Sequence, residues 1–397
     1  MFRLNSFSKA KICSLLYINN YTIPSGGGKK NKKRNLTVDF LKGWAMLSIV
    51  IFHQSSILFP SWLANLMMNP WNVAVFFIVA GYFLKWDKMI YPLPFIKGKL
   101  KTLYVPATVI YFCAVLLHNL FVRIGWYPLD GLHPGTGKPF ELYGLKDIVV
   151  GCGKALLCAG SGELIMGAMW FLYTLFYSMI GLSFLSWFVN KSIKDSVKQQ
   201  WALFLILLLG VILSCISTQK FGFTINRVNI AITAMFLINT GRLVKQRLHV
   251  GFDNPWMLIT CILVFVQCFI FQHVPLAMAN NIFQDIGWLV LGSLSIIYVY
   301  TFIAMRMEHT YFVRCIARIG RDSFYVMALH IFGYFCCSSL LVAVGMFETT
   351  SEKGMYTFAY GNNVIAFLLY TFSASCIPLL VVQIKDKVKV MILSKSY

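Results

Sequence analysis

Charged side chains are scarce in this chain of 397 residues. They make up 12% of it, whereas about 25% is usual in a soluble globular protein. Hydrophobic residues make up 58%, and the mean hydropathy is +0.70. The lack of charge excludes an ordinary soluble domain, and the excess of apolar residues predicts a polytopic integral membrane protein that is surrounded by membrane lipids.

Acidic residues are scarcer than basic ones, with 14 Asp and Glu against 35 Lys and Arg, so the formal net charge is +21. In a soluble protein this excess would suggest a nucleic-acid partner. Here the positive charges lie in short segments between apolar runs, where they act as topology signals. The sequence contains no RNA- or DNA-binding motif, and we exclude a nucleic-acid partner.

Cysteine is present, but not in a metal-binding pattern. None of the eleven Cys residues forms a CxxC or Cys/His spacing, so the sequence predicts no metal site. Cys152 and Cys158 share one long segment, where a disulfide and two free thiols are both open alternatives. The chain also lacks an internal repeat, and therefore the inverted-repeat signature of many transporters.

Ten apolar runs are long enough, or nearly long enough, to cross a bilayer. They cover residues 40–58, 71–84, 103–123, 168–189, 200–218, 228–245, 255–272, 286–305, 322–345 and 362–382. The second run is short for a crossing helix and must be buried or extended into its flanks. The sequence thus predicts an all-α fold of about ten transmembrane helices.

Basic residues fall on alternate sides of these runs. The segments on the predicted inner side hold Lys85, Lys88, Lys97, Lys99, Lys101, Lys191, Lys194, Lys198, Arg242, Lys245, Arg247, Arg306, Arg314, Arg318, Arg321, Lys385, Lys387, Lys389 and Lys395. The segments on the outer side hold fewer: Lys138, Lys146, Lys154, Lys220, Arg227 and Lys353. This bias predicts that both termini are cytoplasmic.

The runs divide the chain into three parts. Residues 1–36 form a basic cytoplasmic tail, residues 37–385 form the membrane domain, and residues 386–397 form a second basic tail. One outer loop, 124–167, is long and rich in Gly and Pro, and loops of this length are usually functional or disordered. Within it, residues 146–157 can form a short helix at the membrane surface.

The first apolar run carries polar residues on one helical face. Asp39, Lys42 and His53 fall within a ~60° arc, and Lys42 and His53 lie ~16 Å apart along the axis. Charge in a membrane helix is costly and usually faces a polar interior. A functional site is therefore one reading. The alternative is that Asp39 and Lys42 mark the membrane entry and that His53 is a satisfied core residue.

Four separated pieces of sequence together resemble acyltransferase family 3, and within it the branch of fucose 4-O-acetylase-like enzymes. They are Lys42-x10-His53, the run 75–83 with Gly81 and Tyr82, the run 95–106 followed by Trp170-Phe-Leu, and Gly320-Arg-Asp-Ser323-Phe-Tyr325-Val-Met-Ala-Leu-His330. The resemblance spans about residues 37–385. Each piece is weak alone, and their order and spacing carry the match.

The resemblance implies an integral membrane enzyme, expected in the bacterial inner membrane. Such enzymes move an acyl group, usually acetyl from acetyl-CoA, onto a hydroxyl of a cell-surface glycan or a lipid-linked sugar. The family's Arg-x10-His motif falls on Lys42 and His53, with Lys in place of Arg. Its Arg-x-x-Arg motif falls on Lys99 and Thr102 and is incomplete, so Lys97, Lys99 and Lys101 are the candidates for holding the CoA phosphates.

The chemistry of the residues fits acyl transfer. His53 can take the proton of an acceptor hydroxyl as general base. Lys42 can hold a phosphate as a point charge, with Asp39 beside it. The thin arm of CoA can then reach from Lys42 toward His53. For the lysines at positions 97, 99 and 101, a plain topology signal is the open alternative.

Other polar residues are weaker candidates. His330 lies two helical turns after Ser323 on the same face, where acid–base work and a structural role are both open. Tyr82, Trp170 and Tyr325 can line a tunnel or pack in the core, and His118 in the third run is expected to pack without a partner. A glycan-precursor transporter or flippase, and a membrane protein without catalytic activity, remain alternatives. The acceptor sugar, the acyl group and the oligomeric state are not specified by the sequence.

Overall fold

The computed structural model describes residues 20–21, 34–54, 71–128, 139–157, 163–225, 227–247, 251–271, 277–346 and 364–394. Most of the predicted N-terminal tail, the Gly- and Pro-rich stretch 129–138 and Cys158 lie outside these residues. The pairing of Cys152 with Cys158 is therefore untested, and Cys152 itself is half-buried on a helix.

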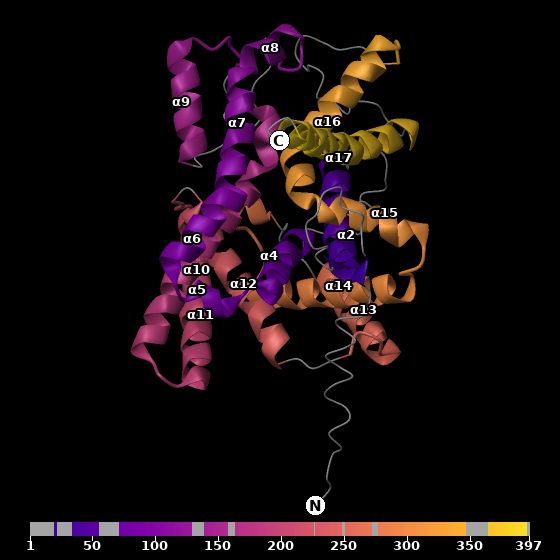
Figure 1. Cartoon of the computed structure of the whole chain (residues 1–397). Helices are drawn as coiled ribbons and strands as arrows, with labels where there is room; N and C mark the ends of the chain where they lie inside the picture. Colours follow the sequence, from indigo (N-terminus) through magenta and orange to yellow (C-terminus); the bar gives the residue numbers. More distant parts are fainter. Residues whose placement is uncertain are drawn as a thin grey trace, which may run out of the picture.

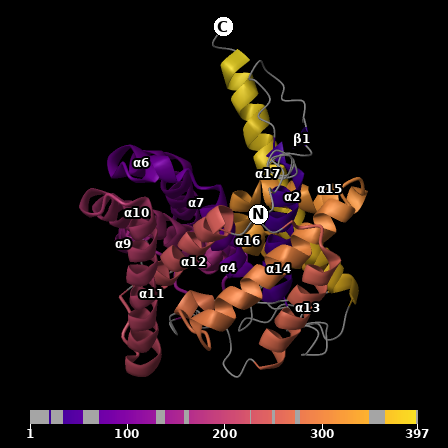
Figure 2. The same cartoon turned by 90° about the horizontal axis from the view of Figure 1, so that it is seen from below.

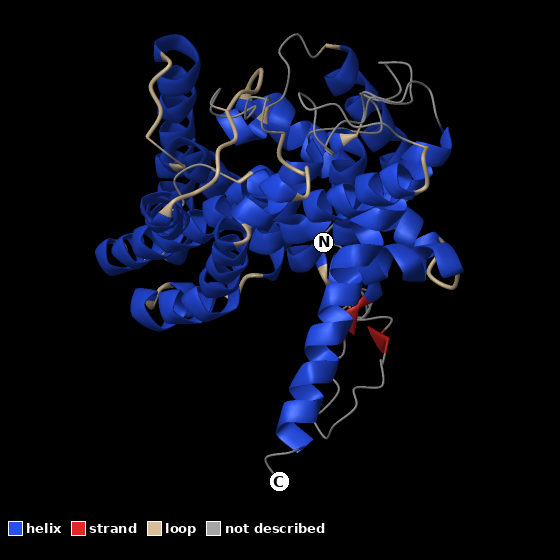
Figure 3. Ribbon diagram, turned by 90° about the horizontal axis from the view of Figure 1, so that it is seen from above, coloured by secondary structure: helices blue, strands red, loops and turns tan. Residues whose placement is uncertain are grey.

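The described residues are almost entirely helical (Figure 1; Figure 3). The longer helices are α2 (Leu36–His53), α4 (Trp71–Phe83), α7 (Val105–Leu116), α9 (Leu145–Leu156), α10 (Trp170–Ser192), α11 (Ser196–Phe221), α12 (Val228–Arg247), α13 (Pro255–Ile270), α14 (Ile286–Arg306), α15 (Tyr311–Arg321), α16 (Ser323–Ala343) and α17 (Val364–Ser394). The shorter ones are α5 (Trp86–Met89), α6 (Pro92–Lys99), α8 (His118–Arg123), the π-helix η2 (Leu100–Tyr104) and the 3-10 helices η3 (Leu164–Met169) and η4 (Met278–Asn280). Two two-residue strands, β1 (Asn20–Tyr21) and β2 (Arg34–Asn35), pair antiparallel.

A helix lies on each of the ten predicted apolar runs. Among the described residues, seven helical stretches are long and apolar enough to cross a membrane: Leu36–His53, Pro92–Leu116, Leu164–Ser192, Ser196–Phe221, Ile286–Arg306, Ser323–Ala343 and Val364–Ile392. Helices α4 and α13 are apolar but shorter, and α12 is not among the seven. The all-helical membrane fold is thus confirmed, while the count of ten crossing helices and the orientation stay predictions.

Side-chain caps explain where several helices begin. The carboxamide of Asn35 accepts the backbone N–H of Val38 at 3.2 Å at the start of α2. Asp195 and Asp285 do the same for α11 and α14, at 2.7 and 2.8 Å. Each cap satisfies one of the N–H groups that the first helical turn leaves without a partner.

Helix α2 lies in the middle of the bundle and packs against α4, α14, α15, α16 and α17 (Figure 1). Its contact with α15 is made backbone to backbone. A Cβ atom on Gly43 would lie 1.9 Å from the carbonyl oxygen of Ile316, and one on Gly320 would lie 1.8 Å from that of Asp39. Small residues allow such close approach between membrane helices. The glycine in the Gly320–His330 motif therefore has a packing role.

Candidate active site

The structure brings His53 and His330 together, although 277 positions separate them in the chain (53 to 330). His53 is the last residue of α2, and His330 lies in α16. Their rings stack with centroids 5.3 Å apart and an interplanar angle of 30°. His330 is fully buried, whereas His53 is half-buried. Two stacked imidazoles at the end of a membrane helix form a candidate site for proton transfer.

The backbone of α16 determines which nitrogen of His330 carries hydrogen. Its Nδ1 lies 3.0 Å from the carbonyl oxygen of Val326 and 3.1 Å from that of Met327. Because carbonyl oxygens only accept, Nδ1 donates, and Nε2 is the lone-pair nitrogen of the neutral ring. Among the described residues, Nε2 of His330 is buried and has no hydrogen-bond partner. A buried nitrogen of this kind is available to a substrate or to a neighbouring N–H group.

Buried hydrogen bonds hold the helices around this histidine pair. The hydroxyl of Tyr334 donates to the backbone carbonyl of Val50, which joins α16 to α2. The amide of Gln54, the residue after α2, donates to the hydroxyl of Thr371 on α17. These bonds lie within one helical turn of His53 or His330, and they fix the three helices that carry the pair.

Lys42 and Asp39 lie near the other end of α2, where Lys42 is half-buried and Asp39 is buried. Helix α15 crosses α2 at this level and brings basic residues to it. Arg318 and Arg321 lie 3.6 and 3.3 Å from the carboxylate of Asp322. Both arginines are thus paired with Asp322, close to the contact that Gly320 makes with α2.

The lysines at positions 97, 99 and 101 lie elsewhere. They belong to α6 and η2, which pack against α10. Figure 2 shows α6 on the opposite side of α2 from α15. Lys97 and Lys101 are exposed, and the ammonium of Lys99 lies 5.3 Å from the centre of the Phe95 ring. The structure does not bring these three lysines to Lys42.

The remaining predicted residues are dispersed. Tyr82 lies under the ammonium of Lys245 at 5.7 Å, and half-buried Trp170 begins α10. Ser323 begins α16. The hydroxyl of Tyr325 accepts a 2.8 Å hydrogen bond from Lys385. Each of these contacts is consistent with packing, and the structure does not place these residues against the histidine pair.

A second polar cluster surrounds His118, for which the expectation of packing without a partner is wrong. Nδ1 of His118 lies 3.2 and 3.1 Å from the two carboxylate oxygens of Glu163. The two side chains are 2% and 1% exposed. Nε2 lies 3.0 Å from the carbonyl oxygen of Glu141 and must donate to it. Both ring nitrogens of His118 are therefore engaged within the protein.

Two tyrosines complete this cluster. The Tyr143 ring stacks on His118 at 3.4 Å and 2°, and the hydroxyl of Tyr127 donates to Glu163 at 3.1 Å. Burial and the nearby Glu163 carboxylate raise the pKa of Tyr127 and of Tyr143. Both phenols therefore keep their protons. His118 also lies after the end of the candidate span Pro92–Leu116. No local spacing links His118 to Glu163, 45 residues further on, so the pair was not predictable from the sequence.

Fold and site together define an integral membrane protein in which α2 and α16 bring two histidines together. The family model described as "Acyltransferase domain" matches residues 35–383. The chain therefore belongs to acyltransferase family 3. Comparison with curated proteins and with solved structures gives no match.

Proposed function

We propose that this membrane acyltransferase moves an acyl group, acetyl in the first instance, from cytoplasmic acyl-CoA to a hydroxyl of a cell-surface polysaccharide or lipid-linked sugar. We further propose that the enzyme belongs to the fucose 4-O-acetylase-like branch of the family and lies in the bacterial inner membrane. We also propose that ten helices cross the membrane and that both termini lie in the cytoplasm. The observation that carries the proposal is the stacking of His53 on His330.

In this reaction His53 acts as general base. It takes the proton of the acceptor hydroxyl, and the hydroxyl oxygen forms an ester bond with the carbonyl carbon of the thioester. The C–S bond breaks, and the leaving sulfur takes the proton back from the imidazolium to become the CoA thiol. A positioned base of this kind contributes typically ~10²–10⁴-fold to the rate. His330, whose Nδ1 is held by backbone carbonyls, orients the His53 ring and offers Nε2 as a second acceptor.

The donor enters from the end of α2 that carries Lys42. The side chain of Lys42 holds a CoA phosphate. The thin pantetheine arm then follows α2 over the ~16 Å that separate Lys42 from His53. Lys97, Lys99 and Lys101 remain a second candidate set for the phosphates, on the other side of the bundle.

Radiolabelled acetyl-CoA added to membranes that contain the protein tests this function. We expect label on glycan that is released by mild alkali, as an O-ester is, and no such label in membranes without the protein. A parallel reaction with succinyl-CoA identifies the acyl group. Absence of glycan label with every acyl-CoA would contradict the proposal. Movement of unlabelled acceptor across the membrane would instead favour a flippase.

A further inference from the structure

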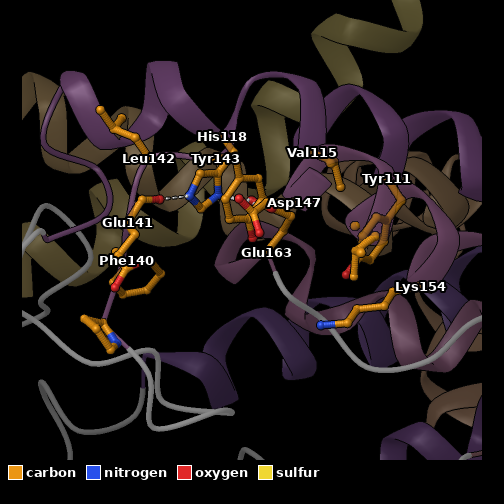
Figure 4. Close-up of a pocket in the computed structure, with 13 residues that line it drawn as sticks. Tyr111, Val115, His118, Phe140, Glu141, Leu142, Tyr143, Asp147, Lys154 and Glu163 are labelled. Atoms are coloured by element: carbon orange, nitrogen blue, oxygen red, sulfur yellow. Dashed lines mark hydrogen bonds and ion pairs between the residues drawn. The ribbon is translucent and has the colours of Figure 1, made fainter. Parts of the chain in front are cut away.

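A cavity of about 380 Å³ lies away from the histidine pair, between α7, α9 and the segment 139–143 (Figure 4). Its volume falls within the range of ~300–1,000 Å³ that is usual for small-molecule sites. Tyr111 and Val115 of α7 form one wall, and Asp147, Val150 and Lys154 of α9 form another. The α9 residues belong to the predicted outer loop 124–167, and the α7 residues belong to the apolar run 103–123 that precedes it.

The His118–Glu163 pair forms the buried polar floor of this cavity. Figure 4 shows His118 between Glu163 and the carbonyl of Glu141, with the Tyr143 ring beside it. A buried, fully hydrogen-bonded pair keeps its geometry, since moving either partner would leave a buried polar group unsatisfied. The cavity therefore has a preformed floor, which lowers the cost of binding a ligand.

The accessible part of the lining carries charges of both signs. An anion would meet the carboxylate of Asp147, and a cation would meet the ammonium of Lys154. A hydroxyl group both donates and accepts, so a polyol can use the Asp147 carboxylate and the Lys154 ammonium together. Tyr111 adds a phenol, and Val115 and Val150 add apolar surface for the C–H faces of a ring. This combination matches a neutral sugar unit.

Packing contacts link the floor of the cavity to α16, the helix that carries His330. Glu163 immediately precedes η3, where a Cβ on Gly167 would lie 3.4 Å from the Ile331 side chain, next to His330. The ring of Tyr127, which donates to Glu163, also contacts that of Phe335 at 6.1 Å. Phe335 lies ~7.5 Å along α16 from His330. A ligand in the cavity therefore sits near the elements that carry the catalytic pair.

We propose that this cavity binds a neutral sugar unit of the acceptor and holds it while a neighbouring hydroxyl is acylated at His53. The inference rests on the proposed function for the identity of the reaction. The binding step itself requires no acyl-CoA.

Binding can be measured on the purified full-length protein in nanodiscs by saturation-transfer NMR. The probes are the methyl glycosides of glucose, galactose, fucose and N-acetylglucosamine, without acyl-CoA. Val150→Trp fills the cavity, and Lys154→Ala removes its ammonium. Their controls are Val149→Trp and Lys146→Ala, on the same helix but outside the lining. We expect at least one glycoside to bind the native protein.

Val150→Trp should abolish that binding, and Lys154→Ala should weaken it about tenfold, because a hydrogen bond to a charged group is lost. Both controls should bind as the native protein does. Binding of no glycoside, or binding that survives Val150→Trp, would overturn the inference even if acyl transfer is observed. Cavity-dependent binding in a protein without transferase activity would support the sugar site and remove the proposed reaction.

Discussion

Replacing Gly320 by Ala should disrupt the packing of α15 on α2. The added Cβ would lie 1.8 Å from the Asp39 carbonyl oxygen and 2.5 Å from the Gly43 nitrogen. Contacts under 3.0 Å between a Cβ and such atoms are essentially never found, so the two backbones must move apart by roughly 1 Å. Forced overpacking of this kind costs typically ~1–3 kcal/mol.

Thermal unfolding of the purified protein in one detergent, followed by intrinsic fluorescence, measures this effect. Gly98→Ala is the matched control, because a Cβ at Gly98 meets nothing within 4 Å. We expect a clear drop in the unfolding temperature for Gly320→Ala and none for Gly98→Ala. Equal stability of Gly320→Ala and the native protein would refute the close contact of α15 with α2.

Three further predictions concern charge. Lys42→Ala should raise the KM for acetyl-CoA about tenfold and leave the KM for the acceptor little changed, because a charge-assisted contact to phosphate is lost. Lys42→Arg should keep the native KM for acetyl-CoA. An unchanged KM for acetyl-CoA in Lys42→Ala would exclude the phosphate role. His118→Leu should lower the free energy of unfolding by ~3–5 kcal/mol, because it leaves the buried Glu163 without its partner. A smaller loss in the double variant His118→Leu/Glu163→Leu distinguishes a broken pair from lost packing. A single variant as stable as the native protein would contradict the His118–Glu163 interaction. In a Cys-depleted background, a membrane-impermeant thiol reagent should label Gly135→Cys on intact cells and not Lys97→Cys, and the opposite pattern would invert the predicted topology.

The sequence predicted what depends on local composition and periodicity. Apolar runs gave a helix in every expected place, because a membrane helix must satisfy its own backbone hydrogen bonds. The helix after residue 145 in the long loop was also expected, and α9 covers Leu145–Leu156. The family was predicted from the order and spacing of four motifs along the chain, and the match over residues 35–383 confirms it.

Contacts between distant segments were not predictable in the same way. The motifs in the sequence identified His53 and His330 as separate candidates. Their stacking depends on the packing of α2 with α16, which the sequence does not specify. His118 was misread because Glu163 lies across a loop and no helical periodicity relates them. The amphipathic helix α15 was counted as a basic connecting segment, since 11 residues with three arginines carry no membrane-helix signal.

The rate of acyl transfer by a folded His53→Ala variant tests the central claim most directly. Protein purified in nanodiscs, with native-like thermal unfolding, is given saturating acetyl-CoA and acceptor glycan, and ester formation is followed under single-turnover conditions. Loss of a general base predicts a rate lower by ~10²–10⁴-fold, with little change in the binding of acetyl-CoA. Transfer at the native rate by the folded His53→Ala variant would contradict the assignment of His53 as the base.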